Sequence, residues 1–312
     1  MRTIKPKKII GIYDVDSSSF PNLALMKISA WHKNKKNKVV LIDPKYPLLN
    51  PKCDIVYCSK VFTYNKQSEY IKQNKKYKRV IYGGIGYGLK SKNLNKYIEH
   101  ICPDYDLYGI DYSLGFLTRG CIRKCSWCIV PEKEGNIKPH ADIEEFLRHN
   151  KAVLMDNNVL ACDHGIKQIE KIIKLGIKVD FNQGLDARLI DNSIAKLLSK
   201  VKWLNPIRLA CDNQSQTKHI QKAVNLLRWH NAHPRNFFVY CLITKDIKES
   251  LNRIKFLKGL NVDPFAQPFI NFKTNERPNK TQRSLARWVN IKSIFYATTW
   301  EEYKYNHENK KT

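Results

Sequence analysis

Short apolar segments alternate with helical segments along almost the whole of this 312-residue chain. The strand-like segments are rich in β-branched and aromatic residues, and the helical ones carry apolar residues every three or four positions. Alternation at this scale is typical of parallel sheets whose faces are covered by helices. The pattern therefore predicts an α/β protein.

The alternation falls into two series and a tail. Residues 1–108 predict a smaller Rossmann-like parallel α/β domain. Residues 109–272 supply about six strand–helix units, fewer than the eight of a closed barrel, and so predict a partial (βα)6 barrel. Residues 273–312 predict a C-terminal helical extension with a basic tail, which we expect to close the open side of the barrel.

Each series has its own predicted elements. The predicted strands are 9–15, 39–43, 54–62, 79–84, 112–118, 152–156, 177–182, 206–212, 237–243 and 262–270. The predicted helices are 20–33, 66–76, 141–149, 165–176, 191–201, 217–230, 245–259 and 283–296. The stretch GGIGYG follows the strand at 79–84, and its spacing matches neither G-x-G-x-x-G nor a P-loop. We interpret it as a tight turn.

The chain carries 55 basic and 28 acidic side chains, for a formal net charge of +27. Such a field attracts polyanions, and nucleic acid is the commonest polyanion in a cell. Most of the excess is lysine, accompanied by many Asn and Ile, which an AT-rich genome produces without selection for binding. A nucleic-acid partner and a purely compositional charge therefore both stay open.

No apolar run approaches the roughly 20 residues that span a bilayer. The start, MRTIKPKKII, lacks the apolar stretch of a signal peptide. We therefore expect a cytoplasmic protein with no membrane partner. Nine cysteines in a reducing compartment indicate buried thiols together with a metal or redox site.

Three of the cysteines cluster in the segment LTRGCIRKCSWCIVPEKEG, as Cys121, Cys125 and Cys128. Thiolates are soft ligands for zinc, copper(I) and iron–sulfur clusters. A [4Fe–4S] cluster has four irons, so three cysteines would leave one iron open for a small molecule. The alternative is a zinc-stabilised nucleic-acid-binding module without catalysis, in which zinc needs a fourth ligand. The candidates for that ligand are His140, His164 and Cys162.

Several predicted strands end in polar side chains, and the three cysteines follow the first strand of the second series. These ends are Thr118 and Arg119, Asp156 to Asn158, Asn182 and Gln183, Asp212 and Asn213, and Thr244. In βα barrels the catalytic groups lie at the carboxyl ends of the strands. Asp and Asn also cap helices and fill turns. The convergence of several such residues nevertheless indicates a site at this rim.

The motif C-x-x-x-C-x-aromatic-C, placed after the first strand of about six βα repeats, resembles the radical S-adenosylmethionine superfamily over about residues 110–270. The resemblance implies that Cys121, Cys125 and Cys128 bind a [4Fe–4S] cluster whose open iron chelates S-adenosyl-L-methionine. One electron would then yield methionine and a 5′-deoxyadenosyl radical that abstracts a substrate hydrogen. A flavodoxin- or ferredoxin-like electron donor is implied too. Trp127 occupies the aromatic position, which lies close to the adenine in this superfamily.

Other cofactor contacts are carried over from the same resemblance. The superfamily often has a Gly-Gly-Glu-like segment after the second strand that contacts the methionine amino group. Here that segment reads MDNNV, which makes Asp156 and Asn157 the candidates. Gln183 and Arg188 lie where later strands supply carboxylate and ribose contacts, and Asp212 closes the fourth strand in a similar place. No catalytic residue, substrate or product is indicated, and a member that keeps the cluster without turnover stays open.

The first series resembles the cobalamin-binding-like domain that precedes the radical core in some members, including radical methyltransferases and methylthiotransferases. The D-x-H-x-x-G motif that supplies an axial histidine is absent. Cobalamin is therefore a cofactor that we consider without favouring it, and a domain that keeps the fold without the cofactor is the preferred interpretation. Cys53, Cys58 and Cys102 show no ligand spacing, so methylthiolation is not predicted.

Overall fold

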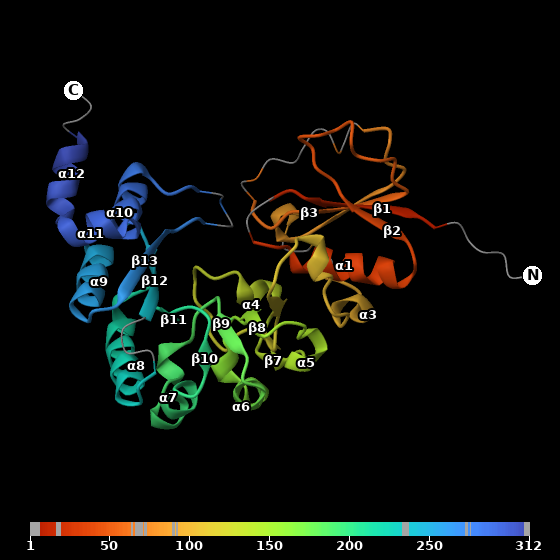
Figure 1. Cartoon of the computed structure of the whole chain (residues 1–312). Helices are drawn as coiled ribbons and strands as arrows, with labels where there is room; N and C mark the ends of the chain where they lie inside the picture. Colours follow the sequence, from red (N-terminus) through yellow and green to blue (C-terminus); the bar gives the residue numbers. More distant parts are fainter. Residues whose placement is uncertain are drawn as a thin grey trace, which may run out of the picture. The chain divides into compact units, whose positions relative to one another are not determined.

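Parallel strands with helices between them make up both of the units into which the chain divides (Figure 1). The structure is a computed structural model, and it describes residues 7–16, 20–63, 65, 71, 74–88, 91, 93–232, 237–271, 274 and 276–308. The first unit contains residues 1–115 and 141–150, and the second contains 116–140 and 151–312. The α/β class expected from the sequence is confirmed.

The first unit is built on a parallel sheet whose described strands run in the order β2-β1-β3-β4. The strands of this sheet are β1 (Ile9–Asp14), β2 (Lys38–Leu41), β3 (Ile55–Ser59) and β4 (Val80–Gly83), and β5 (Ser113–Gly115) also falls in this unit. Its described helices are α1 (Leu23–Asn34), α3 (Lys96–Glu99) and α5 (Ile143–Phe146). The helix expected at 66–76 falls largely outside the described residues.

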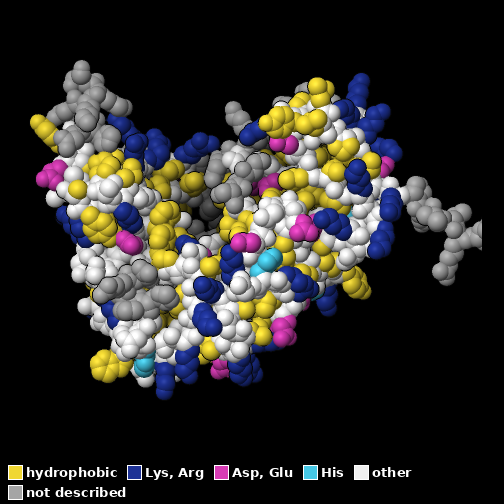
Figure 2. Space-filling view, viewed as in Figure 1, with side chains coloured by type: hydrophobic (Ala, Val, Ile, Leu, Met, Phe, Trp, Pro, Cys, Tyr) yellow, Lys and Arg dark blue, Asp and Glu magenta, His cyan; other side chains and the backbone are white. Residues whose placement is uncertain are grey.

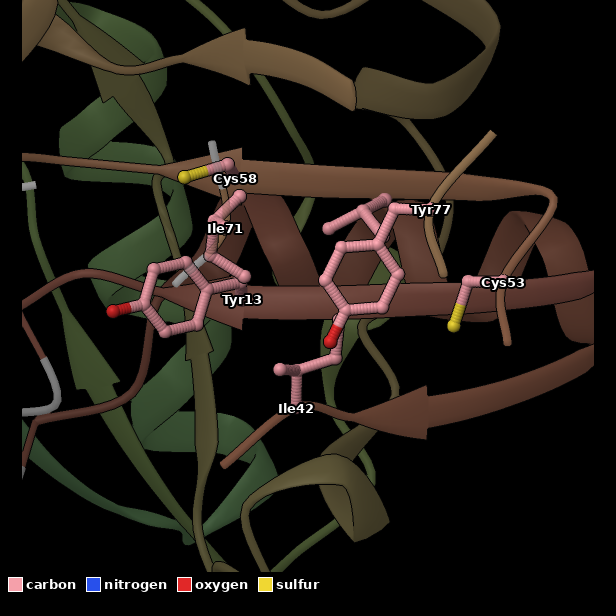
Figure 3. Close-up of a cluster of buried hydrophobic side chains, with 7 residues drawn as sticks. Tyr13, Ile42, Cys53, Cys58, Ile71 and Tyr77 are labelled. Atoms are coloured by element: carbon pink, nitrogen blue, oxygen red, sulfur yellow. The ribbon is translucent and has the colours of Figure 1, made fainter. Parts of the chain in front are cut away.

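Alternate residues of β1 point to opposite faces of this sheet, as the period of a strand requires. Ile10 and Ile12 pack with Leu25 and Ile28 of α1. Tyr13 lies in a second buried cluster, of which Figure 3 shows most members. That cluster consists of Tyr13, Ile42, Cys53, Val56, Cys58, Ile71 and Tyr77. Each face of the sheet therefore has its own core, and Cys53 and Cys58 are core residues.

The glycine-rich stretch after β4 forms the tight turn that its spacing predicts. Gly84 has φ +96°, and a Cβ on it would lie 2.2 Å from the carbonyl oxygen of Lys60. A side chain would therefore collide with backbone at the end of β3. The glycines serve close packing between chain segments.

The second unit contains two parallel sheets, one with β9 between β8 and β10 and one in the order β11-β12-β13. An antiparallel pair, β6 with β7, precedes them. The strands are β6 (Thr118–Arg119), β7 (Lys138–Pro139), β8 (Lys151–Leu154), β9 (Lys178–Phe181), β10 (Lys202–Trp203), β11 (Ile207–Ala210), β12 (Phe237–Ile243) and β13 (Asp263–Pro268). A bridge between Leu185 and Leu209 links the β9 and β11 segments.

The helices of the second unit are α4 (Val130–Lys133), α6 (Asp163–Leu175), α7 (Asn192–Leu198), α8 (Thr217–Trp229), α9 (Ile247–Gly259), α10 (Lys280–Asn290), α11 (Lys292–Ala297) and α12 (Trp300–Glu308). Helices α6 to α9 connect the strands of this unit and lie on their outer side, whereas α10 to α12 follow the last strand (Figure 1). No helix in the described part of the chain is long and apolar enough to cross a membrane.

Three predicted elements differ from the structure, and the first is the helix expected at 141–149, of which only Ile143–Phe146 (α5) is helical. The strand expected at 112–118 is interrupted, because the backbone N–H groups of Leu117 and Thr118 donate to the Asp156 carboxylate instead of to a neighbouring strand. The helix expected at 283–296 is two helices, α10 and α11. They pack beside β13, where the Asn290 side chain bonds the backbone N–H and C=O of Ala266 at 2.8 and 2.9 Å.

Candidate functional site

The three clustered cysteines lie on the loop between β6 and α4, and Gly120 determines how this loop begins. Gly120 has φ +81°, and a Cβ there would lie 2.2 Å from the backbone oxygen of Asn136. Only glycine adopts this conformation without strain and fits this space. The backbone N–H of Cys121 donates to the carbonyl of Gly135 at 3.2 Å. The first cysteine is therefore held against the returning chain.

Glu134 connects this loop to the segment that follows β8. Its carboxylate accepts the Gly120 N–H at 2.9 Å and the Asn157 side-chain amide at 2.9 Å. It also forms an ion pair with Arg119 at 2.9 Å. One carboxylate thus fixes β6, the start of the cysteine loop and Asn157 relative to one another.

Two of the cysteine sulfurs accept N–H donors. Cys121 Sγ accepts the backbone N–H of Arg123 at 3.3 Å and the Asn158 side-chain amide at 3.5 Å. Cys128 Sγ accepts the backbone N–H of Val130 at 3.4 Å. N–H donors stabilise negative charge on sulfur, so these contacts suit thiolates better than thiols.

Asp186 lies beside this loop between two arginines. Its carboxylate bonds Arg123 Nε at 2.9 Å, Arg188 Nε at 2.6 Å and Asn158 Nδ2 at 3.2 Å. Burial opposes its ionisation, but the hydrogen bonds from Arg188 and Arg123 outweigh burial and lower the pKa of Asp186. The group is a buried anion flanked by two cations.

The thiols of Cys125 and Cys128 have raised pKa values because they are partly buried. The positive charge of Arg188 acts against this rise at Cys125. Burial therefore favours the protonated form of both thiols in the free protein. A metal or cluster that binds them displaces protons.

Asp156 bonds the chain just before the cysteine loop. Its carboxylate accepts the backbone N–H of Leu117 at 3.0 Å and the hydroxyl of Thr118 at 2.7 Å. Burial raises the pKa of Asp156 to about 6 although these donors favour the charged form. The Asp156 carboxylate is thus hydrogen-bonded to groups of the protein itself.

Trp127 and Asp212 line a shared cavity of about 430 Å³. Trp127 and Thr244 also line a second cavity of about 450 Å³. Burial raises the pKa of Asp212, while the backbone N–H of Leu242 and the side chain of Trp127 act against that rise. The tryptophan of the cysteine loop therefore borders two open hollows.

The structure brings some of the predicted site residues together and not others. Arg188 is close to the cysteine loop through Asp186, and Asn157 is close through Glu134. Gln183 is exposed in the turn after β9. The assignment of Arg188, Asn157 and Gln183 as cofactor contacts stays a prediction.

Within the described ranges, no three His, Cys, Asp or Glu side chains lie close enough together to bind one metal ion. The zinc ligands suggested by the sequence, His140, His164 and Cys162, are thus not gathered around the cysteines.

Three residues of this site were not singled out from the sequence, and a fourth was marked only as one of several polar residues that follow strands. The three are Arg123, Glu134 and Asp186, and the fourth is Asn158. Glu134 and Arg123 belong to the cysteine segment, but which residues they bond depends on how the loop folds back on itself. Asn158 follows a strand, and Asp186 lies in a turn, which are ordinary places for both residue types.

Comparison with family models and with curated proteins finds no match to the chain. Among solved structures, the chain is similar to Streptococcus suis SuiB, in a crystal structure bound to the precursor peptide SuiA. The TM-score is 0.42 and the identity 11%, over 66% of this chain and 54% of that chain. This chain therefore spans about half the length of SuiB. A likeness at this level does not extend to function.

Proposed function

We propose that the protein is a radical S-adenosylmethionine enzyme whose [4Fe–4S] cluster is bound by Cys121, Cys125 and Cys128. The observation that carries the proposal is the loop itself. Three thiols lie on one short loop at the carboxyl end of β6, and two of their sulfurs accept N–H donors. This donor set suits a cluster with one open iron.

The remaining parts of the chain take roles around that loop. Residues 109–272 form the partial (βα)6 barrel, with 1–108 as an accessory domain and 273–312 as the C-terminal extension. Trp127 and Asp212 line the cavity that receives the adenosyl group, and Arg188 and Asn157 are further ligand contacts. A bound cluster supplies the single electron that cleaves the sulfonium of S-adenosyl-L-methionine.

The accessory domain is not assigned a cofactor. Its polar groups at the carboxyl edge of the sheet bond one another: Tyr108 Oη donates to Asp14 at 2.8 Å, and Asn22 Nδ2 donates to Ser59 at 2.9 Å. The Asp16 carboxylate accepts the backbone N–H of Val61 at 2.6 Å. Cobalamin is therefore not part of the proposed function.

The test is reductive cleavage of S-adenosyl-L-methionine by anaerobically reconstituted protein. The wild type is expected to form 5′-deoxyadenosine, and Cys125→Ala is expected to form none while keeping its helical circular dichroism. Cys162→Ala is the matched control, because it removes a half-buried thiol outside the loop. Cleavage that persists in Cys125→Ala would overturn the assignment. Metal loss in Cys162→Ala with stoichiometric zinc in the wild type would favour the zinc module.

A further inference from the structure

Asn158 is buried beside Cys121, and its side chain has one possible orientation. It is 2% exposed and lies in the segment after β8. Its Nδ2 donates to Cys121 Sγ at 3.5 Å and to Asp186 Oδ2 at 3.2 Å. A carboxylate and a thiolate only accept hydrogen bonds, so the NH₂ end of the amide must face both of them.

That orientation leaves the other end of the amide without a protein donor. Among the described residues, no group donates to the buried Oδ1 of Asn158. A buried acceptor without a donor is destabilising. The stability of the fold therefore does not explain why residue 158 is an asparagine. The contact that does require an amide here is the hydrogen bond from Asn158 Nδ2 to Cys121 Sγ.

Asp186 determines which way this amide donates. The carboxylate is itself held by Arg123 and Arg188, at 2.9 and 2.6 Å. Arg123 also supplies the backbone N–H that bonds Cys121 Sγ. The sulfur of Cys121 therefore receives two N–H donors from one connected set of residues, and only the Asn158 donor belongs to a side chain.

We propose that Asn158 is a positioning residue that raises the reduction potential of the cluster through its hydrogen bond to Cys121. The inference rests on the proposed function, since it requires a cluster on the three cysteines. A reduced cluster carries more negative charge on its sulfurs, so an N–H···S bond stabilises the reduced state more than the oxidised state. Hydrogen bonds to ligands of this kind tune metal centres in general.

The experiment is a potentiometric titration of the anaerobically reconstituted protein, followed by electron paramagnetic resonance of the reduced cluster. Asn158→Leu removes the donor at nearly constant size and is expected to shift the midpoint potential to a more negative value. Iron content and thermal midpoint are measured on the same samples. Asn50→Leu, at a buried asparagine that bonds Asp43 in the first unit, is the control and is expected to leave the potential unchanged.

The outcomes separate this inference from the function on which it rests. A wild-type protein that forms no cluster overturns both. A cluster in the wild type and in Asn158→Leu with the same potential, or a positive shift, overturns the role of Asn158 alone. If the leucine variant loses the cluster, Asn158→Ala is titrated instead, with the same negative shift expected. An equal shift in Asn50→Leu would also contradict the inference.

Discussion

Gly120 is the residue on which the conformation of the cysteine loop depends most directly. Ala at this position combines a positive φ with a Cβ 2.2 Å from the Asn136 carbonyl. We expect Gly120→Ala to lower the free energy of unfolding by more than about 1 kcal/mol. Because the loop must shift, iron retained after anaerobic reconstitution should also fall to less than about half of wild type.

The matched variant for this comparison is Gly259→Ala. Gly259 ends α9, and a Cβ there meets no atom within 4 Å. Alanine is expected to leave the iron content unchanged and to leave stability unchanged or slightly higher. Equal iron content in Gly120→Ala and wild type would contradict the account of the loop.

His32 is a buried base whose surroundings suit only the neutral ring. Asn37 Nδ2 lies 3.0 Å from Nδ1, and Tyr57 Oη lies 3.1 Å from Nε2. With Asn37 donating to Nδ1, the ring carries its proton on Nε2. Burial, with the charges of Lys35 and Lys8, lowers the pKa of His32 from 6.5 to about 4.

This lowered pKa predicts how stability depends on pH. The unfolded chain binds a proton at His32 below about pH 6.5, whereas the folded chain does so only near pH 4. Stability contributed by neutral His32 is therefore present above 6.5 and lost as the pH falls through 4. As the pH falls from 6.5 to 4, the free energy of unfolding of the wild type, measured with urea, should fall by roughly 2–3 kcal/mol more than that of His32→Gln. A constant difference would contradict the prediction.

At the scale of elements, Arg253 of α9 joins the helix to the ends of two strands. Its side chain is fully buried and donates to the carbonyls of Cys211 and Leu242, both at 2.7 Å. It also pairs with Glu249 at 2.7 Å. These bonds hold the carboxyl ends of β11 and β12 in place next to Asp212.

Removing this guanidinium should destabilise the second unit strongly. We expect Arg253→Met to lower the free energy of unfolding by roughly 3 kcal/mol, because two carbonyls lose their donor and Glu249 loses its partner. Arg283→Met, at an exposed arginine of α10, should change it by less than about 0.5 kcal/mol. Denaturant unfolding of the two variants checks this. Similar free energies of unfolding in Arg253→Met and Arg283→Met would contradict the structural role of Arg253.

Most helices and strands could be predicted from the sequence, because their apolar periodicity is local. The interrupted strand near Leu117 could not, since Asp156, which takes its N–H, lies 39 positions away. The break between α10 and α11, at Ile291, was also not predicted, because the apolar periodicity continues across it. Periodicity reports which face is buried and not where a backbone group finds its partner.

The cysteine loop was visible in the sequence because metal ligands recur at a fixed short spacing. The residues that hold it were not visible. Glu134 and Asp186 act through partners 14 or more positions away, such as Gly120 and Asn158. Such pairs form only when the loop folds back and when β8 and β9 lie side by side. Local pattern carries no information about that arrangement.

At the scale of the whole molecule, the net charge of +27 is the dominant electrostatic property. On the face drawn in Figure 2, Lys and Arg side chains are spread over both units and do not form a single patch. Because net charge alone attracts any polyanion, we expect tRNA and random RNA of equal length to bind with affinities within about threefold and to weaken in parallel with added salt. Fluorescence anisotropy at several salt concentrations measures this. Binding of tRNA that survives salt abolishing the random RNA would instead indicate a dedicated nucleic-acid site.

The account as a whole depends on what the three cysteines of the second unit bind. The most direct measurement is the iron and acid-labile sulfide content of protein purified and reconstituted without oxygen, set against Cys125→Ala. The account predicts about four irons and about four sulfides per chain in the wild type. It predicts neither in the variant. Stoichiometric zinc without sulfide, or an intact cluster in Cys125→Ala, would contradict it.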